Sequence, residues 1–149
     1  MIVLIYGQPA CGKTTLAKGI KEKYNISIPL VTIDGDEWRE ISSNTSYDKE
    51  GRMKNLLSAF KLALNLEKQG FLPMLSFVCP YEEARQFLRD KTLLVEIYLQ
   101  YNEDRGRNSY AVPDFEEPKG EVLHLNTTLC QLPLCVELSL MRIYRHFEL

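Results

Sequence analysis

The stretch that decides the fold is MIVLIYGQPACGKT, which occupies residues 1–14. Residues 2–6 form a continuous run of branched and aromatic side chains, which is typical of a buried parallel strand. Residues 7–14 read G-x-x-x-x-G-K-T, the full spacing of a phosphate-binding loop (P-loop). An amphipathic helix is predicted from residue 13 to about residue 23, so the order of strand, glycine loop and helix indicates an α/β protein.

The P-loop predicts a nucleoside triphosphate site, with ATP as the phosphate donor and Mg²⁺ as its metal ion. Glycines allow backbone N–H groups to converge on phosphate oxygens, and the first turn of the following helix adds further N–H groups. We expect Lys13 to reach the β- and γ-phosphates and the hydroxyl of Thr14 to bind the metal. The expected ATP-binding residues of this region are Gly7, Gln8, Pro9, Ala10, Cys11, Gly12, Lys13, Thr14 and Thr15.

The rest of the chain alternates strand-like and helix-like segments. We predict strands over residues 30–33, 71–78, 93–99 and 121–125, helices over 51–69 and 80–89, and a loop or lid over about 101–120. The apolar spacing of Leu134, Leu138, Met141 and Tyr144 predicts a last helix that buries this stripe. This order indicates a three-layer P-loop NTPase or kinase fold, with a five-stranded parallel sheet and helices on both faces, in a single domain over residues 1–149.

Composition narrows the class of protein. The 149 residues carry 18 Lys and Arg against 20 Asp and Glu, a net charge of −2, so the strongly basic balance of many nucleic-acid-binding proteins is absent. No apolar run approaches the about 20 residues that span a bilayer, and the amino terminus resembles no signal peptide. The four cysteines form no C-x-x-C pair. We therefore expect a cytoplasmic protein with reduced thiols, without a structural zinc site and without a membrane partner.

Charged residues follow the second predicted strand in the stretch DGDEWR, residues 34–39. In parallel α/β sheets, ligands bind beyond the carboxyl ends of the strands, so this stretch should lie opposite the P-loop. Asp34 has the chemistry to orient or deprotonate an acceptor hydroxyl, or to hold the waters of the metal. Arg39 has the chemistry to bind an anionic substrate through two parallel hydrogen bonds.

Four motifs in this order resemble those of the adenylylsulfate kinases (APS kinases). They are Gly7–Thr14, Asp34-Gly35-Asp36-x-x-Arg39, Arg52-x-x-Asn55 and Ser76-Phe77-Val78-Cys79-Pro80-Tyr81, with Phe115-Glu116-Glu117-Pro118 and Leu125-Asn126-Thr127 as later segments of similar type. The resemblance implies a P-loop kinase of sulfate assimilation. Such an enzyme transfers the γ-phosphate of ATP to the 3′-hydroxyl of adenosine 5′-phosphosulfate (APS).

The resemblance also implies a role for each matching residue. Asp34 becomes the catalytic base or, with Thr14, a metal-side ligand, and Thr127 joins the ATP-binding residues. The implied acceptor-binding residues are Asp36, Arg39, Arg52, Asn55, Ser76 and Phe77, of which Arg52 and Asn55 grip the phosphosulfate and Phe77 stacks on the adenine.

Two departures separate this chain from the family pattern. Gly51 stands where the family has an aspartate before its arginine, and the short lid, residues 102–110, has no lysine. We expect Arg105 or Arg107 to supply the missing positive charge at the transferred phosphate, and we count both with Lys13 and Asp34 as catalytic residues.

Three alternatives stay open at this point. The first is a P-loop kinase of another hydroxyl acceptor, such as a 5′-hydroxyl polynucleotide, a nucleoside or a small metabolite. The second is a nucleotide-binding module without catalysis, and the third, a GTPase, is disfavoured because the chain lacks D-x-x-G after a strand and an N-K-x-D motif. The expected partner is a small-molecule nucleotide, nucleic acid is disfavoured, and a homodimer is compatible with the sequence.

Overall fold

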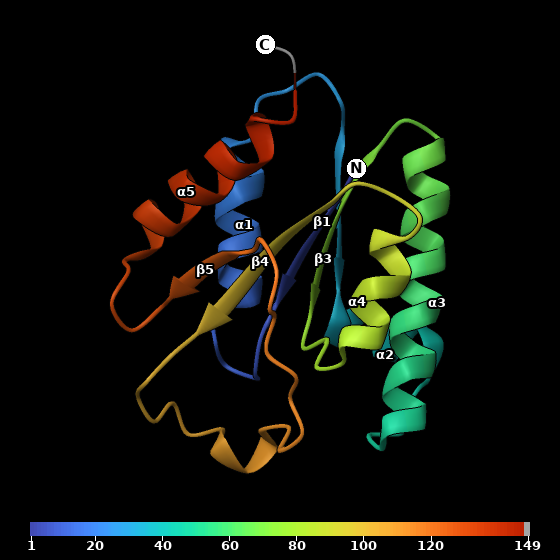
Figure 1. Cartoon of the computed structure of the whole chain (residues 1–149), viewed down its shortest axis with the longest axis vertical. Coiled ribbons are helices and arrows are strands. Elements are labelled where there is room, and N and C mark those ends of the chain that lie inside the picture. Colours follow the sequence, from blue (N-terminus) through green and yellow to red (C-terminus); the bar gives the residue numbers. More distant parts are fainter. Residues whose placement is uncertain (148–149) are drawn as a thin grey trace.

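The computed structural model describes residues 1–147, and the last two residues of the expected single domain lie outside the described residues. Its centre is one parallel sheet of five strands in the order β2-β3-β1-β4-β5 (Figure 1). The strands are β1 (Ile2–Tyr6), β2 (Leu30–Asp34), β3 (Leu72–Phe77), β4 (Leu94–Gln100) and β5 (Leu123–Asn126). The predicted fold class and sheet are therefore confirmed.

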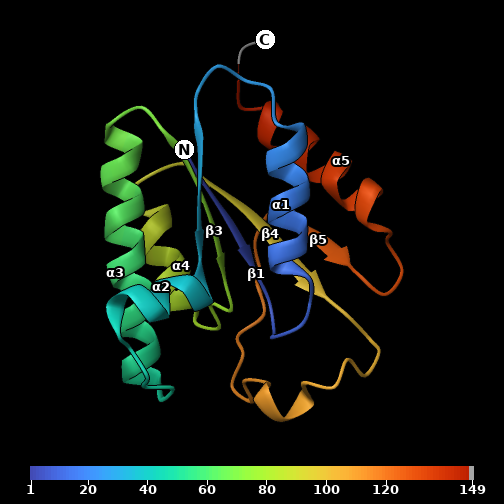
Figure 2. The same cartoon turned by 180° about the vertical axis from the view of Figure 1, so that it is seen from behind.

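Helices cover both faces of the sheet, which gives three layers. One face carries α1 (Lys13–Lys23) and α5 (Leu132–Tyr144), and the other carries α2 (Gly35–Ser42), α3 (Lys49–Lys68) and α4 (Glu82–Arg89), as Figure 2 shows from behind. Residues 101–122 connect β4 to β5 and contain the short 3₁₀ helix η1 (Asn108–Tyr110). No helix within residues 1–147 has the length and apolarity needed to cross a membrane.

The strand β1 packs against both helical layers because its side chains alternate between the two faces of the sheet. Val3 and Ile5 belong to the core under α1 and α5, whereas Ile2, Leu4 and Tyr6 belong to the core under α3 and α4. All five side chains of the strand are fully buried. Because burying a large aliphatic side chain stabilises a fold by about 1.5–3 kcal/mol, this segment anchors the P-loop that follows it.

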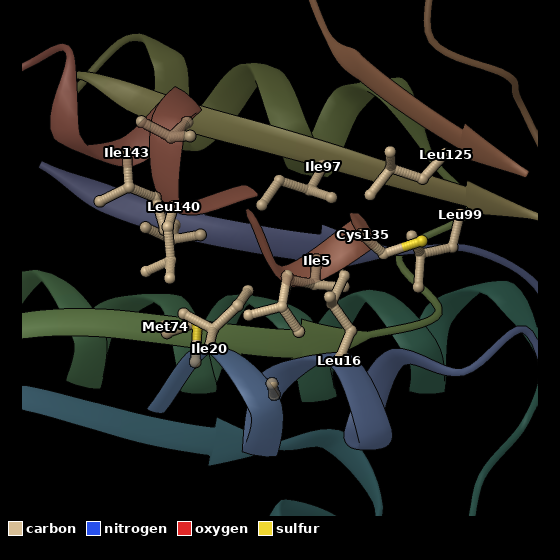
Figure 3. Close-up of a cluster of buried hydrophobic side chains, with 14 of the residues drawn as sticks. Ile5, Leu16, Ile20, Met74, Ile97, Leu99, Leu125, Cys135, Leu140 and Ile143 are labelled. Atoms are coloured by element: carbon tan, nitrogen blue, oxygen red, sulfur yellow. The ribbon is translucent and has the colours of Figure 1, made fainter. Parts of the chain in front are cut away.

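The predicted last helix is confirmed as α5, and Leu138 and Tyr144 of its predicted apolar stripe pack partly buried against the core, but the other two residues of the stripe do not. Leu134 and Met141 are 50% and 62% exposed. The buried residues of α5 are instead Cys135, Val136, Ser139, Leu140 and Ile143, several of which appear in Figure 3. The helix is apolar on more than one face, so spacing alone could not choose between them. The choice follows from α1, where Gly19 leaves room for Val136: a Cβ at Gly19 would lie 2.6 Å from the Val136 side chain.

The helix α2 was not predicted from the sequence, where residues 34–39 were described only as a charged stretch that follows the second predicted strand. Asp34 is the last residue of β2, and its carboxylate caps the helix, because its Oδ1 accepts hydrogen bonds from the backbone N–H groups of Asp36 and Glu37 at 3.0 and 3.4 Å. None of the residues of α2 is buried, so the segment has no buried apolar stripe that could have indicated a helix in the sequence. The cap therefore both starts α2 and holds the Asp34 side chain at the end of the sheet.

Candidate active site

A cavity of about 720 Å³ lies beyond the carboxyl ends of the strands, between the P-loop, α2, α3 and the β4–β5 connection. This is the lower edge of the sheet in Figure 1. Most of the residues predicted for the site border it: Pro9, Ala10, Gly12, Lys13, Thr14, Thr15, Asp34, Asp36, Arg39, Arg52, Asn55, Ser76, Phe77 and Arg107. Donor-side and acceptor-side residues, far apart in sequence, thus share one space.

Five predicted residues within the described chain do not border the cavity, namely Gly7, Gln8, Cys11, Arg105 and Thr127. Gly7 lies at the start of the loop, where a Cβ would collide with the backbone carbonyl of Leu99. Cys11 is fully buried below the loop, and burial raises the pKa of its thiol. Both therefore shape the P-loop from beneath.

The P-loop is held from its outer side through its carbonyl oxygens. Tyr101 Oη donates to Pro9 O, Arg105 Nη1 to Ala10 O and Thr127 Oγ1 to Cys11 O, each at 2.9 Å. Ala10 and Gly12 adopt left-handed backbone conformations, with φ of 66° and 99°. Alternating handedness turns successive N–H groups toward the same side of a loop, which is how backbone concavities for anions form.

Lys13 directs its ammonium group across the mouth of the P-loop. Its Nζ donates to the carbonyl oxygens of Gly7 and Gln8 at 3.1 and 3.0 Å. An ammonium group has three N–H donors, and carbonyl acceptors are weaker partners than charged phosphate oxygens. The side chain is therefore placed to exchange these carbonyls for the phosphates of a nucleotide.

A hydroxyl and a carboxylate meet between the donor and acceptor sides. Thr14 Oγ1, in the first turn of α1, donates to Asp34 Oδ2 at 2.8 Å. Magnesium prefers hard oxygen ligands and is usually held by one or two protein oxygens together with substrate phosphates. Within residues 1–147 no group of three or more His, Cys, Asp or Glu side chains could hold a metal alone. Thr14 and Asp34 offer a hydroxyl and a carboxylate oxygen side by side, and this pair of hard donors fits a magnesium ion that arrives with a nucleotide.

Arg39 borders the acceptor side and organises the loop between α2 and α3. Its Nη1 donates to the carbonyl oxygens of Asn44 and Ser46 at 3.3 and 3.0 Å, and its guanidinium lies 4.1 Å from the centroid of the Tyr47 ring. One side of the guanidinium is thus used to fix the loop. Its charge remains at the cavity wall, together with that of Arg52 from α3.

Asn55 is one of two buried polar residues, with Ser76, among those predicted to bind the acceptor. It is 4% exposed, it borders the cavity, and its Oδ1 has no hydrogen-bond partner among residues 1–147. An unpaired buried acceptor costs about 1–3 kcal/mol. A ligand that brings an N–H or O–H donor to this point would recover that free energy.

Ser76 and Phe77 end β3 beside Asp34, since Ser76 pairs with Asp34 in the sheet. Both are buried, and the ring of Phe77 packs edge-to-face with that of Phe60 at 6.4 Å. Phe77 is thus a core residue that also forms part of the cavity wall. Its stacking on a nucleobase stays a prediction.

Two exposed aromatic residues of the cavity wall were missed by the sequence analysis. Tyr47 and Tyr110 border the cavity and are each 63% exposed. The guanidinium of Arg39 lies over the first ring, and that of Arg107 lies 5.2 Å from the second. Aromatic faces that carry a guanidinium and still face a cavity are suited to bind a planar base. The sequence feature that could have indicated Tyr47 and Tyr110 is that each is an aromatic residue within a polar loop.

The structure separates the two lid arginines. Arg107 borders the cavity, as a residue that neutralises a transferred phosphate should. Arg105 instead donates to the P-loop carbonyl of Ala10, pairs with Glu103 at 2.8 Å and lies over the Tyr101 ring. Arg105 therefore supports the loop from outside, and Arg107 keeps the catalytic expectation.

Gly51, one of the two departures from the family pattern, has a local structural reason. The side chain of Asp48 caps α3 by accepting the Gly51 N–H at 2.7 Å and is itself hydrogen-bonded by Ser46. A Cβ at position 51 would collide with the Ser46 side chain. The glycine is therefore the residue that this capping loop admits.

Together the fold and the cavity define a P-loop kinase. The solved structure of the Mycobacterium tuberculosis APS kinase CysC in complex with AMPPNP and APS superposes with a TM-score of 0.83, covering 95% of this chain and 96% of that one at 17% identity. Within this class the chain belongs to the adenylylsulphate kinase family, whose model matches residues 1–109. The recognised resemblance is thereby confirmed, and family membership places the chain among the kinases.

The curated relatives of this chain include kinases that are named for different substrates. The cytidine diphosphoramidate kinase of Campylobacter jejuni is 31% identical over 101 residues, which cover 66% of this chain and 59% of that protein. The adenylyl-sulfate kinase of Chloroflexus aurantiacus is 26% identical over an alignment of 158 positions, gaps included, which covers 92% of this chain and 85% of that protein. The chain thus spans about three-fifths of the first relative's length and most of the second's.

Proposed function

We propose that this chain is an ATP-dependent phosphotransferase that transfers the γ-phosphate of ATP to a hydroxyl group of an anionic nucleotide, with APS as the first candidate acceptor. The observation that carries the proposal is the continuity of one cavity from the P-loop to Arg39, Arg52 and Asn55. At the junction of the two sides lies the Thr14–Asp34 pair at 2.8 Å. Family membership and the adenylyl-sulfate kinase relatives support the choice of acceptor.

The proposed chemistry needs positioning and charge more than covalent catalysis. Asp34 accepts the proton of the acceptor hydroxyl, the freed oxygen bonds to the γ-phosphorus, and the bond from that phosphorus to the β–γ bridging oxygen breaks to release ADP. Lys13 and Arg107 stabilise the negative charge that spreads over the transferred phosphoryl group. Thr14 would hold a magnesium ion that arrives with ATP, joined by Asp34 in the alternative role of that carboxylate, and the ion would neutralise phosphate charge.

The acceptor side is suited to a nucleotide rather than a neutral alcohol. Arg39 and Arg52 supply positive charge for phosphate groups, and exposed Tyr47 and Tyr110 supply flat surfaces for a base. The net charge of −2 offers little attraction for the long backbone of a polynucleotide. A nucleoside, a small metabolite and binding without catalysis stay as alternatives.

A second candidate acceptor is cytidine diphosphoramidate. The Campylobacter jejuni kinase of that name supports it, and so does the unpaired buried Oδ1 of Asn55. A terminal phosphoramidate carries an N–H₂ donor, whereas the sulfate end of APS carries acceptors only. The terminal group of the diphosphoramidate would thus be able to donate to this oxygen, whereas APS would have to bring its adenine amino group or a ribose hydroxyl to it.

The test is a substrate panel with the purified chain, ATP and Mg²⁺, read by coupled detection of ADP. The panel contains APS, cytidine diphosphoramidate, a nucleoside and a 5′-hydroxyl oligonucleotide, and the product is located by ³¹P NMR. A rate with a 5′-modified nucleotide and a new phosphate on its sugar hydroxyl supports the proposal. ADP release only in the presence of the oligonucleotide or the nucleoside would reassign the acceptor. ATP binding with no ADP release in the presence of any acceptor of the panel would make the chain a binding module.

A further inference from the structure

The first variable position of the P-loop makes a contact that the phosphate-binding role does not use. Gln8 Nε2 donates to the carbonyl oxygen of Val112 at 2.9 Å, and the Val112 N–H donates to Gln8 Oε1 at 2.8 Å. One side-chain amide therefore satisfies both backbone groups of a residue 104 positions away in the sequence. We call this pair of hydrogen bonds the Gln8–Val112 latch.

The Val112 end of the latch is buried, whereas Gln8 is partly exposed. Val112 is 3% exposed, so water gains little access to replace the bonds that Gln8 makes. A buried backbone group that loses its partner is costly, which is why nearly all such groups in proteins are paired. The side-chain amides of glutamine and asparagine carry an N–H donor and an oxygen acceptor next to each other in one plane. The identity of residue 8 thus matters to the lid.

The latched segment forms the lid side of the cavity. Arg107, Ser109, Tyr110, Ala111 and Val112 all border it. Within residues 1–147, the hydrogen bonds that tie this segment to the P-loop are the two of the latch. The contacts of Tyr101 and Arg105 with the loop hold the earlier part of the lid instead.

We propose that Gln8 is a positioning residue that sets the acceptor wall of the cavity by fastening Val112 to the P-loop. The kinetic consequence of this inference rests on the proposed function, because that function places residues 109–112 beside the acceptor. Phosphates that order the P-loop also order Gln8, so the latch carries the state of the donor site to Tyr110 and Arg107. Donor and acceptor binding are coupled through one amide side chain.

The decisive variant is Gln8→Leu, which keeps a side chain of similar size and removes both hydrogen bonds. Gln8→Glu is the graded variant, because a carboxylate still accepts from the Val112 N–H but cannot donate to the Val112 carbonyl. The matched control is Gln69→Leu, at an exposed glutamine after α3 that bonds to Asn65. Each protein is compared with the wild type by hydrogen exchange, by AMPPNP binding and by steady-state kinetics.

Loss of two hydrogen bonds should raise the exchange rate of the Val112 N–H by about tenfold or more in Gln8→Leu, with a smaller rise in Gln8→Glu and none in Gln69→Leu. The acceptor KM should rise by about tenfold in Gln8→Leu, while AMPPNP affinity changes by less than about threefold. Unchanged exchange at Val112 would overturn the latch. Faster exchange with an unchanged acceptor KM, or an equal loss of AMPPNP affinity, would overturn the positioning role.

A failure of the proposed function is distinguishable from a failure of this inference. If no acceptor is phosphorylated, the coupling is read from hydrogen exchange alone. AMPPNP should then protect residues 109–112 in the wild type and in Gln69→Leu but not in Gln8→Leu. Equal protection in all three proteins would refute the coupling without any need for turnover.

Discussion

Replacing Asp34 with asparagine separates two roles that this side chain has in the structure. Its Oδ1 caps α2 through the backbone N–H groups of Asp36 and Glu37, and its Oδ2 accepts the hydroxyl of Thr14. Asparagine is as good a helix cap as aspartate, so the free energy of unfolding should change by less than about 1 kcal/mol, chiefly through the lost charge at the helix start. The cavity wall therefore stays in place in Asp34→Asn.

The catalytic consequence should be much larger. An amide cannot accept the proton of the acceptor hydroxyl, and loss of a general base lowers kcat by about 10²- to 10⁴-fold, which corresponds to about 3–5 kcal/mol of barrier. Asp34→Ala should show the same loss of kcat and a further loss of about 1 kcal/mol in stability, because the cap is removed as well. Thermal unfolding and initial rates of ADP release at saturating acceptor measure the two effects separately.

The matched control is Asp48→Asn, since Asp48 caps α3 through the Gly51 N–H at 2.7 Å without bordering the cavity. This variant should keep kcat within about twofold of the wild type at a similar change in stability. A kcat of Asp34→Asn within about threefold of the wild type, at unchanged melting temperature, would refute the proton-acceptor role.

Three further predictions follow from named contacts. Arg39→Ala should raise the acceptor KM more than the ATP KM, because its guanidinium fixes the acceptor-side loop; an equal rise in both would move Arg39 to the donor side. Gly51→Asp should destabilise the fold by about 1–3 kcal/mol in urea unfolding, since a Cβ there collides with Ser46, and unchanged stability would contradict the packing. Burial and the neighbouring Cys130 raise the pKa of Cys135 to about 12. At pH 8 iodoacetamide should therefore label half-exposed Cys130 first, and the labelling of Cys135 should keep increasing up to about pH 12. Peptide mapping measures both reactions, and a result in which Cys135 is labelled first would refute this order.

The local parts of the site could be predicted because each depends on neighbours in the chain. The glycine and lysine spacing of residues 7–14 predicts the curled loop, and the continuous apolar run of residues 2–6 predicts the buried strand in front of it. The alternation of strands and helices then predicts that Asp34 and Ser76, each at a strand end, lie at the same edge of the sheet. The register of β2 and β3 pairs these two residues.

Contacts between distant segments required the tertiary structure. Two of these contacts join residues about 100 positions apart: the latch from Gln8 to Val112 and the hydrogen bond from Arg105 to the P-loop. The exposure of Tyr110 depends on such a contact. No periodicity encodes them, because polar loop residues obey no repeating pattern of burial. The direction of a loop side chain is decided by whatever segment packs beside it.

The sequence by itself thus determined the class of fold and the edge of the sheet where the P-loop, Asp34 and Ser76 lie, since these follow from backbone geometry and from patterns within single elements. Only the tertiary structure decided which face of α5 is buried, because Gly19 of α1 admits Val136, and which lid arginine reaches the cavity. The sequence of an apolar helix face or of a charged loop does not indicate which other segment it will contact. Close packing between elements selects one arrangement from several that the local pattern allows equally.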